Sequence, residues 1–345
     1  IKTRKLRSKQ KMLTSVFVFL FLYITGCSGA KSCRLADVYK GDNNFHVPPE
    51  CTKLALGGEK LGDEGVIALS QALTETTKAN GLKNLAEVHL PTTGMGPLGA
   101  DALATFLTST GSGSSLRVLN LYGNQLGDAG AESLSKMFSG NNHAGIPLET
   151  LGIGVNNIGA MGAKALAKEL GECSNCPLKT LGLYRNNVGD EGAIEMAKMV
   201  SKNVIALSSL FLGGNDVKNS GAVALGDALR TNTKLKVLSL EGGSVGNTGA
   251  MSLAQGLIIS KTLIALDIRS CLPTHRNCFV GHLTTNDFKD SSTSSDSDSD
   301  SSDSSDPNKM SNQGLLALKN AVLLRFQDKD KPDLKVVGDI NFAVE

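Results

Sequence analysis

The sequence predicts an α/β fold, a right-handed solenoid in which about eight strand–helix units stack side by side. Aliphatic residues recur in a fixed frame whose eight copies, here repeats 1 to 8, begin 28 to 34 residues apart at Cys51, Leu85, Leu116, Leu148, Leu178, Leu207, Leu235 and Leu263. Glycine, which occurs 38 times, stands at one place in the second half of the repeats. Aromatic residues are 4% of the 345 residues and Trp is absent, so the core must be aliphatic. Such a period is typical of a stacked repeat fold.

The first half of each repeat predicts a short strand. When the first residue of the frame is offset zero, offsets three and five are aliphatic in every repeat, as in Leu181 and Leu183. Side chains of a strand alternate between its faces, so these two positions point to one face, the core. Offset eight follows the strand and is Asn124, Asn156, Asn186 or Asn215 in four repeats, and Glu59, Thr93, Gly243 or Cys271 in the others. An amide there can satisfy turn backbone groups that no strand partner reaches.

The second half of each repeat predicts a helix. Gly162 stands at offset fourteen of repeat 4, and Leu166 and Leu170 follow at the spacing of one helix face. We expect the glycine to let the helix start approach its neighbour closely. Asp128 of repeat 3, like its equivalents in other repeats, comes two residues before the glycine, where it is expected to act as an N-cap.

The frame also predicts the domain organisation. A repeat domain covers residues 51–345, with a cap at residues 31–50 and a final strand near the C-terminus. In repeat 8 the helix pattern resumes only at Gly314, so residues 273–310 are expected to be a Ser/Asp-rich disordered insertion. Its part Asp290–Asp306 contains only Asp, Ser and one Thr, which cannot form a core, and disorder is expected there.

Residues 1–30 predict a secretion signal or a lipoprotein-type signal. Six cations precede the apolar stretch Met12–Thr25, which is short for a membrane span, and small residues follow as far as Ala30. Ile24–Cys27 resembles a bacterial lipobox, in which Cys27 would carry lipid, and an uncleaved anchor is the alternative. We therefore expect a secreted or extracellular membrane-anchored protein, or a cytoplasmic one if this segment does not function as a signal.

The cysteines fit an oxidising compartment. Of the seven, all but Cys27 form three couples close in sequence, which predict the disulfides Cys33–Cys51, Cys173–Cys176 and Cys271–Cys278. Two of these have alternatives. Cys173 and Cys176 can be a redox pair or two idle thiols, and Cys271 can be a turn residue because it stands at offset eight. No metal site is expected.

The frame L-x-x-L-x-L-x-x-N-x-L, seen from Cys51 to Leu272 and again after Met310, resembles leucine-rich repeat proteins. The long repeats with a helix in each resemble the ribonuclease-inhibitor-like class, which also contains the sensor ends of NOD-like receptors and the GTPase-activating protein for Ran. The resemblance implies a horseshoe with parallel strands on the concave face and helices on the convex face.

A non-enzymatic protein-binding module is the function we expect, with a protein partner on the concave face. The residues expected to contact it vary while the frame is kept, and aromatic and Arg side chains are typical anchors: His89, Tyr122, Tyr184, Arg185, Phe211, Glu241 and Arg269. The sequence has no catalytic constellation and predicts no cofactor. The net charge of +2, without a basic stripe carrying aromatics, does not favour nucleic acid.

Two other functions stay open. One is a GTPase-activating protein resembling the Ran activator, which would be intracellular. The other is a scaffold whose acidic insertion binds cations or basic partners.

Overall fold

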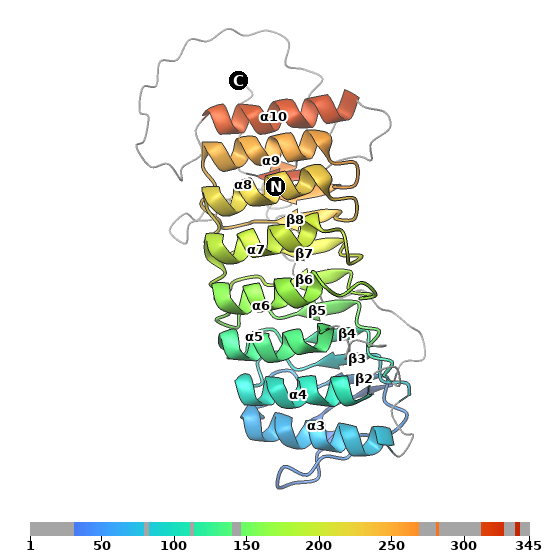
Figure 1. Cartoon of the computed structure of the whole chain (residues 1–345). Coiled ribbons are helices and arrows are strands. Elements are labelled where there is room, and N and C mark those ends of the chain that lie inside the picture. The colour runs from blue at the N-terminus through green and yellow to red at the C-terminus, as the bar shows by residue number, and fades with distance from the viewer. Residues whose placement is uncertain are drawn as a thin grey trace, which may run out of the picture.

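The computed structural model describes residues 31–78, 83–110, 114–139, 146–268, 281–282, 312–327 and 335–338. Over these residues, strands and helices alternate along the chain, and the helices lie side by side in one layer (Figure 1). The strands join one sheet in which neighbouring repeats pair in parallel. The predicted fold, a leucine-rich-repeat-like solenoid of parallel strands and helices, is confirmed.

The sheet runs through the whole stack. Its strands are β1 (Ser32–Cys33), β2 (Lys53–Ala55), β3 (Glu87–His89), β4 (Val118–Asn120), β5 (Thr150–Gly152), β6 (Thr180–Gly182), β7 (Ser209–Phe211), β8 (Val237–Ser239), β9 (Ala265–Asp267), β10 (Gly281–His282) and β11 (Lys335–Gly338). Strands β1 to β9 pair in chain order and in parallel, and β11 pairs in parallel with β9. The register aligns equal offsets, so that Leu181 lies beside Leu151 and Leu210.

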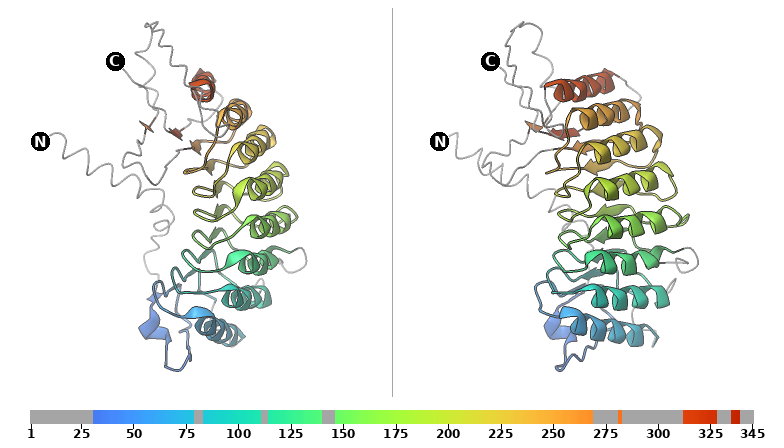
Figure 2. Two further views of the ribbon diagram at one scale, coloured as in Figure 1. Left: turned by 90° about the vertical axis from the view of Figure 1, so that its left-hand side faces the viewer. Right: turned by 60° about the vertical axis from the view of Figure 1, so that its left-hand side comes forward.

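One face of this sheet is covered by the helices α3 (Gly62–Lys78), α4 (Pro97–Thr110), α5 (Gly127–Ser135) with the 3-10 turn η2 (Lys136–Phe138), α6 (Ala160–Leu170), α7 (Gly189–Ser201), α8 (Asn219–Thr231), α9 (Asn247–Ile259) and α10 (Asn312–Gln327). The short helix α2 (Leu35–Val38) follows β1 at the N-terminal end. Figure 2 shows the helices along the outer side of a curved stack. The curvature follows because a helix is about 10 Å wide whereas strands lie about 4.8 Å apart.

The core lies between the sheet and the helices. Leu181 of β6 and Leu183 just after this strand are fully buried. Leu166 and Leu170 of α6 are fully buried as well. Burying one such side chain contributes roughly 1.5–3 kcal/mol. Because each repeat leaves its aliphatic face bare until a neighbour covers it, the stacked repeats share one continuous aliphatic layer.

The predicted role of the asparagines at offset eight is confirmed. The buried Asn186 side chain donates from Nδ2 to the carbonyls of Ile153 (3.0 Å) and Leu183 (2.8 Å). Its Oδ1 accepts hydrogen bonds from the backbone N–H groups of Asn156 (2.8 Å) and Ile158 (3.1 Å). One amide thus satisfies four backbone groups and links two repeats, which explains why it recurs in the turn.

The expected N-cap is wrong in one respect, because the side chain caps the next helix and not its own. Asp128 lies in the first turn of α5, and its Oδ1 accepts hydrogen bonds from Gly159 N (2.7 Å) and Gly162 N (2.8 Å) at the start of α6. A Cβ on Gly162 would lie 2.7 Å from this oxygen, so the predicted close approach at the glycine is confirmed. The equivalent side chains act alike across the stack: Asp63 on α4, Asp190 on α8, Asn219 on α9 and Asn247 on α10.

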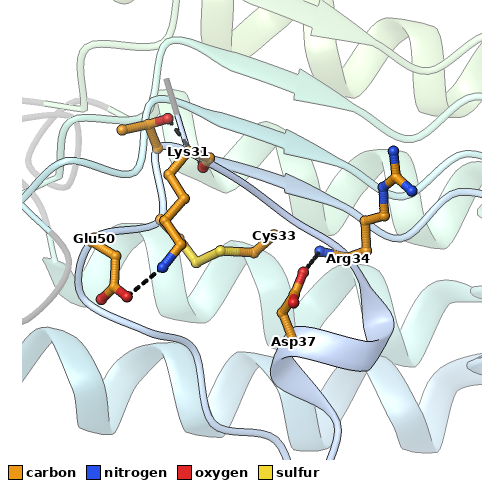
Figure 3. Close-up of a disulfide and its surroundings, with 7 residues drawn as sticks. Lys31, Cys33, Arg34, Asp37 and Glu50 are labelled. Carbon is orange, nitrogen blue, oxygen red and sulfur yellow. Dashed lines mark hydrogen bonds and ion pairs between the residues drawn. A yellow bond between two sulfur atoms is a disulfide. The ribbon is translucent and has the colours of Figure 1, made fainter. Parts of the chain in front are cut away.

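The N-terminal end is closed by β1, which pairs with β2. A disulfide joins Cys33 of β1 to Cys51, and both residues are fully buried. Beside it, Lys31 Nζ lies 2.5 Å from Glu50 Oε1 (Figure 3). These contacts tie residues 31–50 to the first edge of the sheet.

At the other end, α10 packs on α9, and β11 follows β9 in the sheet. Gly314 N donates to Asn247 Oδ1 (3.3 Å), as the helix-start glycine does in the other capped repeats. One strand was not expected from the sequence. It is β10, which lies within residues 273–310 and pairs antiparallel with β11.

Several predicted features lie outside the described residues. They are the signal in residues 1–30 with Cys27, the contact residue Arg269, the Cys271–Cys278 disulfide, and the acidic stretch Asp290–Asp306. None of the described helices combines the length and the apolar character needed to cross a bilayer.

Candidate functional site

Five residues at offset six of repeats 3 to 7 form a line across the sheet, here called the tyrosine row: Tyr122, Gly154, Tyr184, Gly213 and Glu241. They follow strands β4 to β8, and the backbone pairing continues through them. Gly123 N donates to Gly154 O (2.9 Å), Val155 N to Tyr184 O (2.8 Å), and Arg185 N to Gly213 O (2.7 Å). The row is therefore held in the same register as the strands.

Each tyrosine ring of the row lies over the glycine of the next repeat. A Cβ on Gly154 would lie 3.2 Å from Cδ2 of the Tyr122 ring, and one on Gly213 would lie 3.0 Å from Cδ2 of Tyr184. The rings occupy the space that a larger residue would need. The alternation of tyrosine and glycine thus lets each ring pack against the backbone of the next repeat.

Arg185 adds a cation to the row. Its guanidinium carbon lies 5.3 Å from the centroid of the Tyr184 ring, within the range of a cation–π contact. A Cβ on Gly214 would lie 2.8 Å from Cγ of Arg185, so this side chain also leans over a glycine of the next repeat.

The electrostatics of the row centre on Tyr184. Burial raises the pKa of its hydroxyl, and the negative charge of Glu241 raises that pKa further, whereas Arg185 lowers it. Tyr184 is half-buried, while Tyr122 is 39% exposed. The row and the adjacent Arg185 therefore combine two aromatic rings with one positive and one negative charge on a partly solvated surface.

Two other predicted contact residues lie in the strands, at offset four. Phe211 lies in β7, two residues before Gly213 of the row, and is half-buried. His89 lies in β3, where Nε2 is 3.0 Å from Glu87 Oε2, and the same Glu87 oxygen is 3.1 Å from Lys53 Nζ. Burial lowers the pKa of His89, and the hydrogen bond to Glu87 opposes this effect. The described contact residues thus divide into the tyrosine row, Phe211, and a polar cluster at His89.

Some strand residues at offset four, between the two aliphatic positions of the frame, are buried. Asn120 and Ser239, at offset four, are 7% and 4% exposed. Asn120 bends back on its own strand end, where Oδ1 accepts a hydrogen bond from Tyr122 N (3.1 Å). The exposed aromatic surface therefore lies at offset six, beyond the ends of the strands.

One charged cluster was missed from the sequence. Glu149 lies between Arg117 and Lys179, with Oε1 2.9 Å from Arg117 Nη1 and Oε2 2.8 Å from Lys179 Nζ. The hydrogen bond from Lys179 lowers the pKa of Glu149, and Arg117 lowers it further. All three residues stand at offset one of successive repeats, so their alternating charges were a usable signal. Among the described residues, no three His, Cys, Asp or Glu side chains gather in the manner of a metal site.

Three segments of the chain match the family model of leucine-rich repeats: residues 114–135, 174–197 and 231–254. The segments contain β4, β6 and β8 with parts of the helices that follow, so the matched sequence and the observed repeats coincide. The match is to leucine-rich repeats in general, and the ribonuclease-inhibitor-like class stays a prediction.

A comparison with curated proteins gave no significant match. Among solved structures, actin-binding site 2 of leiomodin-1 is similar over 40% of this chain and 77% of that chain, with 19% sequence identity and a TM-score of 0.34.

Proposed function

We propose that this leucine-rich repeat solenoid is a protein-binding module and that the tyrosine row is its contact surface. The observation that carries the proposal is the packing of Tyr122 and Tyr184 over Gly154 and Gly213, with Arg185 stacked on one ring. Rigid aromatic side chains and Arg are the residue types that dominate binding energy at protein interfaces. Packing of the rings against the next repeat also restricts them before a partner binds, which reduces the entropy lost on binding.

The core supports the same assignment. The frame residues are buried and hold the repeats together, so they have no surface to offer a partner. The residues of the row differ from repeat to repeat while the backbone beneath them repeats. This separation of scaffold from variable surface suits recognition of a particular protein.

The test uses a purified partner. Immobilised wild-type protein is used to capture partners, each captured protein is identified and purified, and its affinity is measured for the wild type and two variants. Tyr122→Ala combined with Tyr184→Ala is expected to weaken binding at least tenfold while circular dichroism shows that the variant is folded. Met161→Ala, at a side chain that is 68% exposed on helix α6, is the control and should change the affinity less than twofold. Equal affinity of the double variant and the wild type would contradict the proposal.

We also propose that the protein is exported. Two features support this: the signal-like pattern of residues 1–30, and the disulfides Cys33–Cys51 and Cys173–Cys176. Disulfides persist mainly in oxidising compartments. Localisation of the tagged full-length protein, with N-terminal sequencing of the mature form, tests the proposal. A protein retained in the cytosol with reduced cysteines would contradict export and would favour the intracellular alternative.

A further inference from the structure

We infer that the tyrosine row binds a polyproline II segment of a partner protein, with prolines three residues apart and a basic residue three positions further on. The inference rests on the proposed function and specifies the kind of partner. It is argued from three properties of the row: its spacing, the chemistry of its surface and the order of its charges.

The spacing of the row matches the polyproline II helix. Tyr122, Tyr184 and Glu241 occupy the same offset after β4, β6 and β8, so each is two strands from the next. Paired strands lie about 4.8 Å apart, which gives about 9.6 Å between these positions. A polyproline II helix has three residues per turn and rises about 3.1 Å per residue, so residues on one face recur about every 9.3 Å.

The surface of the row suits proline. The rings of Tyr122 and Tyr184 stand on Gly154 and Gly213, which add no side chain beside them. Polyproline II segments dock on aromatic surfaces and lose little conformational entropy, because they are preformed. Backbone groups of the row are already bonded to neighbouring repeats, for example Gly123 N to Gly154 O. A partner is therefore held by side-chain packing and not by strand pairing.

The charges of the row give the ligand a direction. A Cβ on Gly213 would lie 3.0 Å from Cδ2 of Tyr184 and 3.1 Å from the backbone oxygen of Glu241, so Tyr184 and Glu241 flank the same glycine of the row. The negative charge of Glu241 also raises the pKa of the Tyr184 hydroxyl. A basic residue of the ligand three positions after the second proline would lie opposite Glu241. Arg185, stacked on Tyr184, repels a basic residue placed at that ring. The order aromatic, aromatic, acidic thus selects proline, proline, basic residue.

Labelled synthetic peptides test this inference on the full-length chain. A peptide containing Pro-Ala-Ala-Pro-Ala-Ala-Arg is compared by fluorescence anisotropy with one whose anchors are four residues apart and with one in which Glu replaces Arg. We expect saturable binding of the first peptide and at least tenfold weaker binding of the other two. Absence of saturable binding at millimolar concentration, or equal binding of the two spacings, would overturn the inference.

Variants of the protein locate the site. Tyr122→Ala is expected to weaken binding of the first peptide at least tenfold, and Met161→Ala is expected to leave it unchanged. Glu241→Gln should reduce the preference for Arg over Glu in the peptide, and Glu241→Lys should reverse it. An unchanged charge preference in both Glu241 variants would overturn the assigned direction, and circular dichroism confirms that each variant is folded.

The two proposals can fail separately. If the purified protein partner binds through the tyrosines while no proline peptide binds, the proposed function stands and the inference is wrong. If neither the partner nor the peptides depend on the tyrosines, both are wrong.

Discussion

The turn after each strand places one residue, at offset seven, in the left-handed region of backbone conformation. Its φ is positive in all seven described repeats that contain it: Gly58, Thr92, Gly123, Val155, Arg185, Gly214 and Gly242. A residue with a Cβ is disfavoured there by roughly 1–2 kcal/mol, so glycine is the easy choice. Arg185 occupies this position beside Tyr184 with a φ of 52°. Thr92 and Val155 occupy the same position with φ of 54° and 56°, so the strain belongs to the turn of the repeat and not to Arg185 alone.

Loss of the Asn186 side chain is expected to lower the free energy of unfolding. Asn186→Ala leaves the Ile153 carbonyl and the N–H groups of Asn156 and Ile158 without their partner, whereas Leu183 O keeps its hydrogen bond from Asn215 Nδ2 (2.9 Å). Each unsatisfied buried group costs about 1–3 kcal/mol. We expect a loss of about 3 kcal/mol or more in the free energy of unfolding, measured in urea. The exposed neighbour gives the control, since Asn187→Ala should change stability by less than about 0.5 kcal/mol. A loss below about 1 kcal/mol in Asn186→Ala would show that water replaces the amide.

His89 should make stability depend on pH. Its pKa in the folded protein is below the usual value of 6.5, because burial disfavours the charged ring, although Glu87 partly opposes this. Below pH 6.5 the unfolded chain therefore binds more protons than the folded one, and stability falls as pH decreases toward the folded-state pKa. His89→Asn removes this titration, so its unfolding free energy should decline less than that of the wild type between about pH 8 and about pH 5.

The wild type and His89→Asn share their carboxylates, so the difference between their two curves isolates the histidine. Parallel curves over this range would mean that the ring titrates equally in both states. A steeper decline in the variant would mean that the folded state favours the charged ring, which is the opposite of the sign expected here.

Three of the described helices begin at a glycine with positive φ, and each of these also supplies a cap to the next helix. Helices α3, α5 and α7 start at Gly62, Gly127 and Gly189, each with positive φ, and each glycine is followed by an Asp. That Asp caps the start of the next helix, α4, α6 or α8. Orphan N–H groups at a helix start must find an acceptor, and here the stack provides it from outside the helix.

Asp128 tests this arrangement. Asp128→Ala removes the acceptor for Gly159 N and Gly162 N, and the loss of a cap costs about 0.5–2 kcal/mol. We expect the destabilisation to appear as faster amide exchange at the start of α6, not in α5, which carries the substitution. Asp128→Asn keeps an acceptor oxygen and should restore most of the stability. Exchange that accelerates only in α5 would mean that the side chain serves its own helix.

Over the whole solenoid, each repeat contacts its neighbours in the stack, so stability is a sum of local terms. The ends are the weak points because one side of a terminal repeat has no neighbouring repeat to cover it. At the N-terminal end β1, the short helix α2 and the Cys33–Cys51 disulfide take that place. The sheet edge at the other end is extended by β11 and β10.

The two disulfides should therefore differ in effect. Cys33 and Cys51 are 18 residues apart, and closing a loop of that length stabilises by about 3 kcal/mol in the chain-entropy model. Cys173 and Cys176 are 3 residues apart, and the same model gives about 2 kcal/mol. Replacing Cys33 and Cys51 by Ala should open β1 and β2 to hydrogen exchange while leaving β6 protected. Replacing Cys173 and Cys176 should affect only the link between α6 and β6, and uniform loss of protection in either variant would contradict local stability.

The contact surface could be predicted only in part. Tyr122, Tyr184 and Glu241 share one offset in the sequence, which was enough to place them on one line. That Tyr184 lies over Gly213, and that Asn120 is buried, could not be predicted. These features depend on how far a side chain leans toward the next repeat, and local patterns carry no such information.

Periodicity along the chain was sufficient to identify the strands, the helices and the buried face. The spacing of aliphatic residues within one segment, such as the alternation of Leu181 and Leu183, indicates both the type of the segment and the face that it buries. Stacking alone decided which side chains meet across repeats, such as Asp128 with Gly162, 34 residues later. The physical reason is that alternation is a property of one segment, whereas a hydrogen bond between repeats requires the lateral register that only their packing creates.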